Sequence, residues 1–188
     1  MTMDNLPDVL LIDVMSYVGY CGYDMPMIDV TTNIRRLYNA NAFIWHEVAF
    51  CDIPNVKGFI KSIDINCDGC IDRLKSNSDL RHYNLEKLTL CVDPTDYDYN
   101  NVIISEHTEV DIRDLNEEDL TLCPILPTNT KIVGLRENQL HEFLESHMKY
   151  IKDNQIRIKI YLEYGIRRNI KNMKDNDIPY SLEGFELQ

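Results

Sequence analysis

The sequence lacks any long apolar run, and no stretch approaches the roughly 18 consecutive apolar residues that a membrane-spanning helix needs. Its N-terminus carries acidic residues and lacks the basic and apolar layout of a secretory signal. No Asn-x-Ser/Thr glycosylation site occurs in the chain. We therefore expect an intracellular protein, in the cytoplasm or the nucleus.

Basic residues are also scarce. The 19 lysines and arginines stand against 31 aspartates and glutamates, which gives a formal net charge of −12. Binding to nucleic acid irrespective of base sequence needs a surface rich in lysine and arginine, and anionic membrane surfaces attract the same residues. The composition therefore argues against nucleic acid and membrane as partners.

Motifs of catalysis are missing as well. The chain has no glycine-rich phosphate loop and no nucleophile elbow. The stretch that begins His141-Glu142 resembles a zinc-protease helix, but Glu145 occupies the place of the second histidine. We therefore expect no enzymatic activity.

Two segments carry incomplete metal-ligand patterns. Asp64-x-Asn66-x-Asp68 is the front half of a calcium loop, but Lys75 stands at the twelfth position, where calcium needs a carboxylate. The same residues fit a strand followed by a turn. Calcium is therefore not expected here.

The second pattern is Cys67-x-x-Cys70, which supplies half of a zinc site or a redox pair. A structural zinc needs two more ligands. The remaining four cysteines are isolated in the sequence, at positions 21, 51, 91 and 123. From spacing alone we expect reduced, mostly buried thiols, with no metal and no cofactor.

The first fifty residues predict three short helices. Apolar residues four positions apart form one face of the first helix: Leu6, Leu10, Val14 and Val18, widened by Leu11 and Met15. The second helix is expected over residues 29–38 and the third over residues 41–50. Helices this short cannot form an independent core, so they need another protein or the rest of the chain.

This N-terminal region resembles an F-box. The resemblance rests on the Leu6-Pro7-Asp8 helix start, the Tyr17-Val18 helix end, the Ile34-Arg35-Arg36-Leu37 segment and Ile44-Trp45. An F-box docks on the SKP-family adaptor of a cullin-RING ubiquitin ligase. The resemblance therefore implies this adaptor as a partner, with docking residues at Leu6, Pro7, Leu10, Val14 and Trp45.

From residue 60 onward the sequence repeats weakly. Six copies fit or approach the pattern L-x-x-L-x-L, and they begin at Ile60, Leu85, His107, Thr130, Gln155 and Leu182. These starts lie 25, 22, 23, 25 and 27 residues apart. This period is typical of leucine-rich repeats, each with one short strand. One strand buries too little to fold alone, so the repeats are expected to stack.

The segments between the repeats differ in character. Helices are expected over residues 139–152, 164–173 and, more weakly, 69–80. The lead-ins Ile53-Pro54, Leu126-Pro127 and Ile178-Pro179 resemble those of FNIP repeats, which are relatives of leucine-rich repeats. The alternative is an irregular α/β domain whose strands mimic a period.

Alternate residues of each expected strand face away from the core. On this face the acidic residues lie in the early strands and the cations in the late ones. Aromatic and arginine side chains dominate protein interfaces, so we expect a target protein to contact Arg136, Arg157, Lys159 and Tyr161. Replacing Arg157 and Tyr161 is expected to spare the fold. The alternative is a solvated face without a partner.

The sequence thus predicts an α/β protein in two parts: a three-helix F-box-like domain over residues 1–50, then a short leucine-rich-repeat-like solenoid with a parallel sheet over residues 51–188. The resemblances imply the substrate receptor of an SCF-type ubiquitin ligase, which holds an unknown target near the ligase. The alternative is a non-catalytic repeat interaction protein whose N-terminal helices only cap the array.

Overall fold

The protein is an α/β fold organised around a parallel sheet. A computed structural model describes residues 6–18, 32–55, 58–92, 97–116, 118–121, 126–162 and 177–183. Seven strands pair in chain order, and each pairing is parallel. They are β2 (Val48–Ala49), β4 (Ser62–Ile65), β5 (Lys87–Leu90), β6 (Glu109–Asp111), β7 (Ile132–Arg136), β8 (Arg157–Tyr161) and β9 (Tyr180–Glu183).

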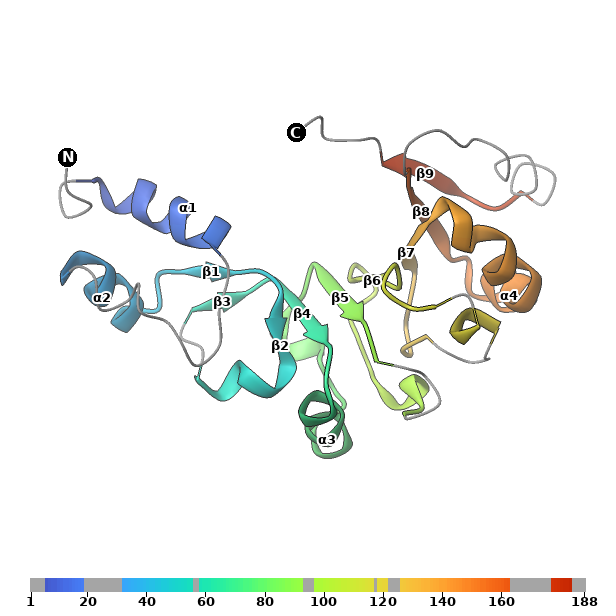
Figure 1. The fold of residues 1–188 in the computed structure, drawn as a ribbon, viewed down its shortest axis with the longest axis horizontal. Helices are drawn as coiled ribbons and strands as arrows, with labels where there is room; N and C mark the ends of the chain where they lie inside the picture. Colours follow the sequence, from blue (N-terminus) through green and yellow to red (C-terminus); the bar gives the residue numbers. More distant parts are fainter. Residues whose placement is uncertain are drawn as a thin grey trace.

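The segments between these strands are mostly short helices. In Figure 1, α3 (Asp68–Ser76) lies below the early strands and α4 (Leu140–Asn154) lies beside the late ones. The 3-10 helices are η3 (Phe50–Asn55), η4 (Arg81–Tyr83), η5 (Tyr99–Asn101), η6 (Asp119–Thr121) and η7 (Glu137–Gln139). The helix expected over residues 164–173 lies outside the described residues.

The register of the sheet follows the sequence period. One inward row runs through Ile63, Leu88, Val110, Val133, Ile158 and Tyr180, which are successive register partners. The first five are fully buried, and Tyr180 packs partly buried against the same core. The strands expected in the first five repeats are therefore confirmed.

The strand expected in the sixth repeat is displaced. The sequence pattern began at Leu182, but β9 covers Tyr180–Glu183 and places Tyr180 opposite Ile158. Ile178 is buried just before the strand. The core therefore takes up Ile178 and Tyr180, so the strand starts earlier than the leucine pattern indicated.

A second ladder connects the return segments on the other side of the repeats. Asp79, Ile103 and Thr128 form successive parallel bridges. Backbone N–H groups of Leu80 and Thr128 donate to the carbonyls of Ile103 and Val102, each at 2.8 Å. Neighbouring segments therefore stack through their return paths as well as through their strands.

The N-terminal region differs from the expected three-helix segment. Its described residues, 6–18 and 32–50, contain two helices, α1 (Asp8–Val18) and α2 (Thr32–Asn39). The third helix, predicted over residues 41–50, is wrong: this stretch forms β1 (Ile44–Trp45) and β2, and β1 pairs in parallel with β3 (Phe59–Ile60).

Backbone conformation explains why this stretch is not helical. Asn41 and Glu47 both have φ of 54°, which a right-handed helix cannot accommodate. Between them Phe43 and Trp45 are fully buried while Ile44 is only partly buried, a period of two rather than 3.6. The apolar residues of this stretch therefore follow the period of a strand, and the helix predicted from them does not form.

The region before residue 50 shares its structure with the region after it. Val48 and Ala49 of β2 are register partners of Ile63 and Asp64 of β4. One continuous cluster of buried residues runs from Leu11 in α1 to Ile178 before β9. The expected boundary at residue 50 therefore falls between two paired strands. Within the described part of the chain, no helix is long and apolar enough to cross a membrane.

Candidate functional site

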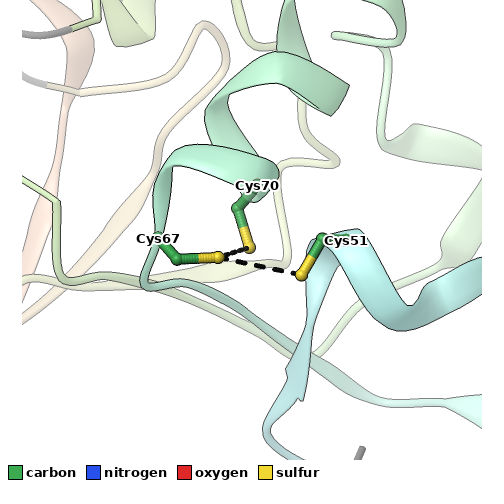
Figure 2. A group of neighbouring side chains, drawn as sticks. All are labelled: Cys51, Cys67 and Cys70. Carbon is green, nitrogen blue, oxygen red and sulfur yellow. Dashed lines mark hydrogen bonds between the residues drawn. The ribbon is translucent and has the colours of Figure 1, made fainter. Parts of the chain in front are cut away.

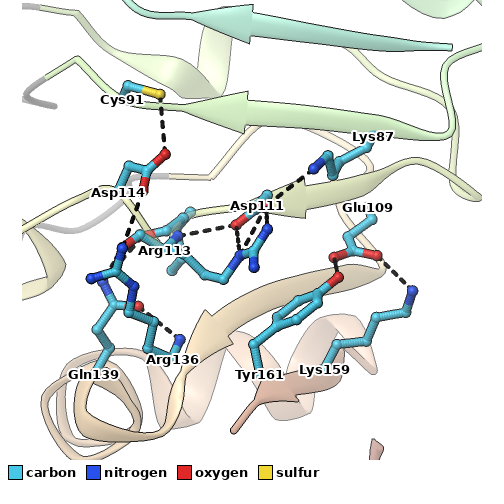
Figure 3. Close-up of polar contacts among 11 residues, drawn as sticks. Lys87, Cys91, Glu109, Asp111, Arg113, Asp114, Arg136, Gln139, Lys159 and Tyr161 are labelled. Carbon is cyan, nitrogen blue, oxygen red and sulfur yellow. Dashed lines mark hydrogen bonds and ion pairs between the residues drawn. The ribbon is translucent and has the colours of Figure 1, made fainter. Parts of the chain in front are cut away.

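The strand residues that point away from the apolar core form one surface, which we call the open face. Along the sheet it carries Ser62 and Asp64, then Lys87 and Thr89, Glu109 and Asp111, Ile132 and Gly134, and Arg157, Lys159 and Tyr161. On this face, which was expected to bind a target, Glu109 and Asp111 are only 6% and 1% exposed. Its centre is a network of polar contacts (Figure 3).

Glu109 is held by two residues from β8. Its carboxylate accepts hydrogen bonds from Lys159 Nζ and from the Tyr161 hydroxyl, each at 2.6 Å. Gly134 belongs to β7, which lies between β6 and β8. A Cβ at this position would stand 2.5 Å from Glu109 Oε1 and 3.0 Å from Tyr161 Cε2. The small residue in β7 thus lets β6 and β8 exchange polar contacts across it.

Asp111 makes the second contact of the network. Arg113 binds it bidentately, with Nη2 at 2.7 Å from Oδ2 and Nε at 2.9 Å from Oδ1, and Lys87 Nζ lies 3.5 Å from Oδ2. Burial raises the pKa of Asp111, but the hydrogen bonds and charge of Arg113 outweigh burial and hold the pKa below its ordinary value. The carboxylate is therefore ionised at neutral pH.

Arg113 also links the two acidic residues of the network. Its guanidinium carbon lies 3.9 Å from the centre of the Tyr161 ring, a cation–π contact. Burial, together with the hydrogen bond to Glu109, raises the pKa of Tyr161. The phenol therefore stays protonated and donates to Glu109. The acidic residues of β6 thus form ion pairs within the protein: Asp111 with Arg113 and with Lys87 of β5, and Glu109 with Lys159 of β8.

The network continues towards the start of α4. Arg136 Nη2 lies 3.3 Å from Asp114 Oδ1, and Gln139 Nε2 donates to the carbonyls of Ile112, Arg113 and Leu115. A shallow hollow beside these contacts is lined by Leu115, Asn116, Glu118, Arg136, Asn138 and Gln139. The open face therefore ends in a concave, polar margin.

The structure brings together three of the four residues expected to bind a target. Lys159 and Tyr161 meet at Glu109, and Arg136 lies at the margin with Asp114. Arg157 lies in the outermost row, opposite Ile132, and is exposed. The expectation that Tyr161 can be replaced without cost to the fold is at odds with its bond to buried Glu109.

Sequence reasoning missed Arg113, which holds the network together. It comes two residues after Asp111 and outside β6, so strand alternation could not place it on this face. A signal was available: the same Asp-x-Arg order recurs at Asp79 and Arg81, where the side chains make the same bidentate contact. A repeated Asp-x-Arg predicts an ion pair within the chain.

The residues expected to dock an adaptor lie in different environments. Leu10 and Val14 of α1 are 48% and 39% exposed, and Val9 beside them is 68% exposed. Pro7 is exposed and Leu6 packs partly buried against the core. The helix buries its neighbouring stripe instead, Leu11 and Met15, each 1% exposed.

Trp45, the fifth of these residues, is fully buried. Its ring packs edge-on against Phe43, with the centroids 5.3 Å apart. A side chain in this position cannot touch an adaptor without unfolding its surroundings. Its role is to hold β1 against the core.

A third group lies apart from the open-face network, where η3 meets the start of α3 (Figure 2). Three sulfur atoms converge: Cys67 Sγ lies 3.5 Å from Cys70 Sγ and 3.7 Å from Cys51 Sγ. Cys67 is exposed, Cys51 is partly exposed and Cys70 is buried. The fold thus adds Cys51 to the Cys67-x-x-Cys70 pair.

The pKa values of Cys51 and Cys67 are shifted in opposite directions. Burial and the adjoining Cys70 and Cys67 thiols raise the pKa of Cys51 to about 12. Burial also raises the pKa of Cys67, but backbone and side-chain donors, among them the N–H groups of Cys70 and Gly69, outweigh burial and lower it overall. Cys67 therefore ionises before Cys51.

The stretch that resembled half of a calcium loop forms two regular elements. Asp64 belongs to β4, and Asp68 begins α3. Lys75, at the position of the missing carboxylate, pairs with Asp72 at 3.1 Å. The strand-and-turn interpretation is thus correct as far as the strand, and a helix follows it.

No protein-family model, no curated protein and no solved structure matches this chain.

Proposed function

We propose that this chain is a short solenoid of leucine-rich-repeat type that binds another protein on its open face and performs no chemistry itself. The observation that carries the proposal is that both the strands and the return segments repeat along the chain. Strands recur every 22–25 residues along one inward row, and the return segments form a second ladder through Asp79, Ile103 and Thr128. Stacked repeats of this kind present extended binding surfaces.

In this proposal the N-terminal helices cap the array. Two observations favour capping over a separate domain: β2 pairs with β4, and Leu11 and Met15 of α1 belong to the same buried cluster as the repeats. Terminal repeats need a cover for their apolar edge. The region up to residue 50 supplies that cover at the β2 end of the sheet.

The open face suits recognition because its polar groups are held in place before a target arrives. Lys159, Tyr161 and Arg113 are each fixed by a contact with Glu109 or Asp111. Side chains that are already ordered lose less conformational entropy when a target binds, so more of the interaction energy contributes to affinity. Exposed Arg157 and half-exposed Ile132 flank this network and offer direct contact with a target.

The test compares two charge reversals by affinity purification from cells of the source organism. Arg157→Glu alters the open face at an exposed position, and Lys149→Glu alters the exposed side of α4 by the same charge. We expect Arg157→Glu to deplete the specifically captured protein at least about tenfold, equivalent to about 1.4 kcal/mol, and Lys149→Glu to leave capture unchanged. Equal capture by wild type and Arg157→Glu would reject the open face as the binding surface.

A second candidate function, substrate receptor of an SCF-type ubiquitin ligase, is favoured by one observation. Val9, Leu10 and Val14 leave an apolar stripe exposed on α1, and contiguous exposed apolar residues mark interaction sites. In this candidate the stripe docks on the SKP-family adaptor, and the open face brings the target to the ligase by raising its effective concentration.

Adaptor binding is tested by co-purification. The double variant Leu10→Asp and Val14→Asp removes the apolar stripe while Leu11 and Met15 stay buried in the core. We expect the wild type to retain the adaptor and its cullin, and the double variant to lose both. Absence of the adaptor from wild-type preparations would leave capping as the function of α1.

A further inference from the structure

We propose that Cys51, Cys67 and Cys70 form a binding site for one zinc ion that fastens η3 to the start of α3. The observation behind it is convergence: these sulfur atoms all lie within 4.8 Å of one another, although Cys51 is 16 residues away from Cys67 in the chain. Spacing in the sequence offered only two ligands. The third comes from the fold.

The distances fit a metal–thiolate centre. Zinc–sulfur bonds of about 2.3 Å in a tetrahedron place the sulfurs about 3.8 Å apart. The two sulfur–sulfur distances of 3.5 Å and 3.7 Å lie close to this value. An ion can therefore occupy the space between the thiols with only small side-chain adjustments.

The surroundings prepare the same centre. Cys67 is the N-cap residue of α3, and the backbone N–H groups of Cys70 and Ile71 donate to its carbonyl, which fixes Cys67 at the start of the helix beside Cys70. In its protonated form the Cys70 thiol donates to Asn66 Oδ1 and to the Asp64 carbonyl, each at 3.6 Å, which holds its sulfur beside that of Cys67; zinc binding would release this proton.

The ligand set selects the class of ion. Three thiolates favour thiophilic ions such as zinc over calcium or magnesium, which prefer oxygen ligands. Three protein ligands leave a fourth position of the tetrahedron for water or an external group. Cys67 is exposed, so an ion can enter from solvent on its side.

Such an ion would act on the fold. Cys51 lies at the beginning of η3, directly after β2, whereas Cys67 and Cys70 follow β4. Bound zinc would cross-link the capping region to the first strand-and-helix unit of the array. Ligands that bind only the folded state stabilise it by mass action.

Metal binding is tested on the full chain, kept reduced, stripped with a chelator and titrated with Zn²⁺. We expect about one zinc per chain, a rise in Tm on zinc addition, and thiolate-to-metal charge-transfer absorption when Co²⁺ replaces zinc. Calcium and magnesium should not compete. A reduced wild type that binds no zinc would overturn the proposal.

The informative variant is Cys67→Ser, because the exposed side chain can change without leaving a cavity. We expect it to weaken zinc binding by more than about 100-fold, beyond the usual cost of losing an outer-shell contact. Cys91→Ser is the matched control, since Cys91 contacts Asp114 on the open face and lies outside the cluster. Equal affinity in wild type and Cys67→Ser, or an equal loss in Cys91→Ser, would contradict the site.

A measurement without variants guards against misfolding. Alkylation of the wild type, followed by peptide mapping, should show zinc protecting Cys51 and Cys67 while Cys91 reacts at an unchanged rate. Protection that is absent, or spread equally over Cys91, would also contradict the site.

Discussion

At the scale of single residues, burial decides how much an ion pair contributes to the free energy of unfolding. Asp111–Arg113 and Asp79–Arg81 share one local geometry, with Nη2–Oδ2 distances of 2.7 Å and 2.6 Å and the same Nε–Oδ1 distance of 2.9 Å. The Asp111 side chain is 2% exposed, whereas that of Asp79 is 47% exposed. The chain therefore contains its own control for a buried pair.

We predict that Arg113→Ala lowers the free energy of unfolding by about 3 kcal/mol, because the buried Asp111 carboxylate loses its bidentate partner and keeps the backbone N–H of residue 113 and the more distant Lys87. Arg81→Ala should have a much smaller effect, since water replaces its partner at Asp79. Urea unfolding of the two variants measures the difference. Equal destabilisation would show that the local geometry matters and burial does not.

Asp64 provides a prediction with pH dependence. Burial raises its pKa, Glu47 and Asp111 add to the rise, and Oδ1 has no hydrogen-bond partner among the described residues. A carboxyl with a raised folded pKa favours the fold below its unfolded pKa and loses that contribution as pH rises through the folded pKa. Its charge therefore costs stability at pH 7.

Asp64→Asn should consequently stabilise the protein at pH 7 by about 0.5 kcal/mol. The gain is small because solvent screens the charge of this partly exposed carboxylate. The gain should shrink towards pH 4, where the wild-type carboxyl takes up its proton. Tm measured at both pH values tests the sign. A gain that is constant with pH would point to packing in place of charge.

At the scale of elements, α1 shows how two adjacent apolar stripes can have different roles. The sequence grouped Leu10, Val14, Leu11 and Met15 on one wide face, but only Leu11 and Met15 enter the core. Periodicity could establish that the helix is apolar on one side. It could not establish which part of that side the rest of the chain covers.

We predict that Leu11→Ala costs about 2–5 kcal/mol of stability, because it opens a cavity in the core. Leu10→Ala, one residue away and 48% exposed, should change stability by less than about 0.5 kcal/mol. Thermal unfolding of both variants checks the assignment of the two stripes. Similar losses would mean that α1 buries both.

Strands were predictable wherever local pattern and burial agree. The inward residues of β4, β5, β7 and β8 could be identified from the sequence because each strand keeps two apolar residues in alternation. The stretch over residues 41–50 failed because left-handed Asn41 and Glu47 are invisible to an apolar pattern. The position of β9 failed because Ile178 and Tyr180, rather than leucines, face the core.

At the scale of the whole molecule, residues before and after position 50 contribute to one hydrophobic core. Phe43, Trp45 and Phe50 are fully buried in the cluster that includes the repeat strands, and β2 covers the edge of β4. The resemblance to a separate F-box domain concealed this continuity, since the pairing of β2 with β4 links residues that no local motif connects. The site was visible in the sequence only in part: the order Asp111-x-Arg113 indicates their ion pair, whereas the contacts of Arg113 with Tyr161 and of Cys51 with Cys67 arise only through the fold.

We predict that residues 51–188 expressed alone do not reproduce the stability of the whole chain. Removing residues 1–50 exposes the apolar end of the array and the unpaired edge of β4, which favours aggregation. Size-exclusion chromatography and thermal unfolding should show aggregation or a lower Tm than the full chain. An unchanged Tm in a monodisperse fragment would establish residue 50 as a domain boundary.

Site-specific photo-cross-linking in cells tests most directly whether the open face contacts another protein, as we propose. A photoreactive amino acid placed at position 157 on β8 should yield a discrete cross-linked partner, and the same amino acid at position 149 on α4 should not. A partner captured from position 149 and absent from position 157 would contradict the account.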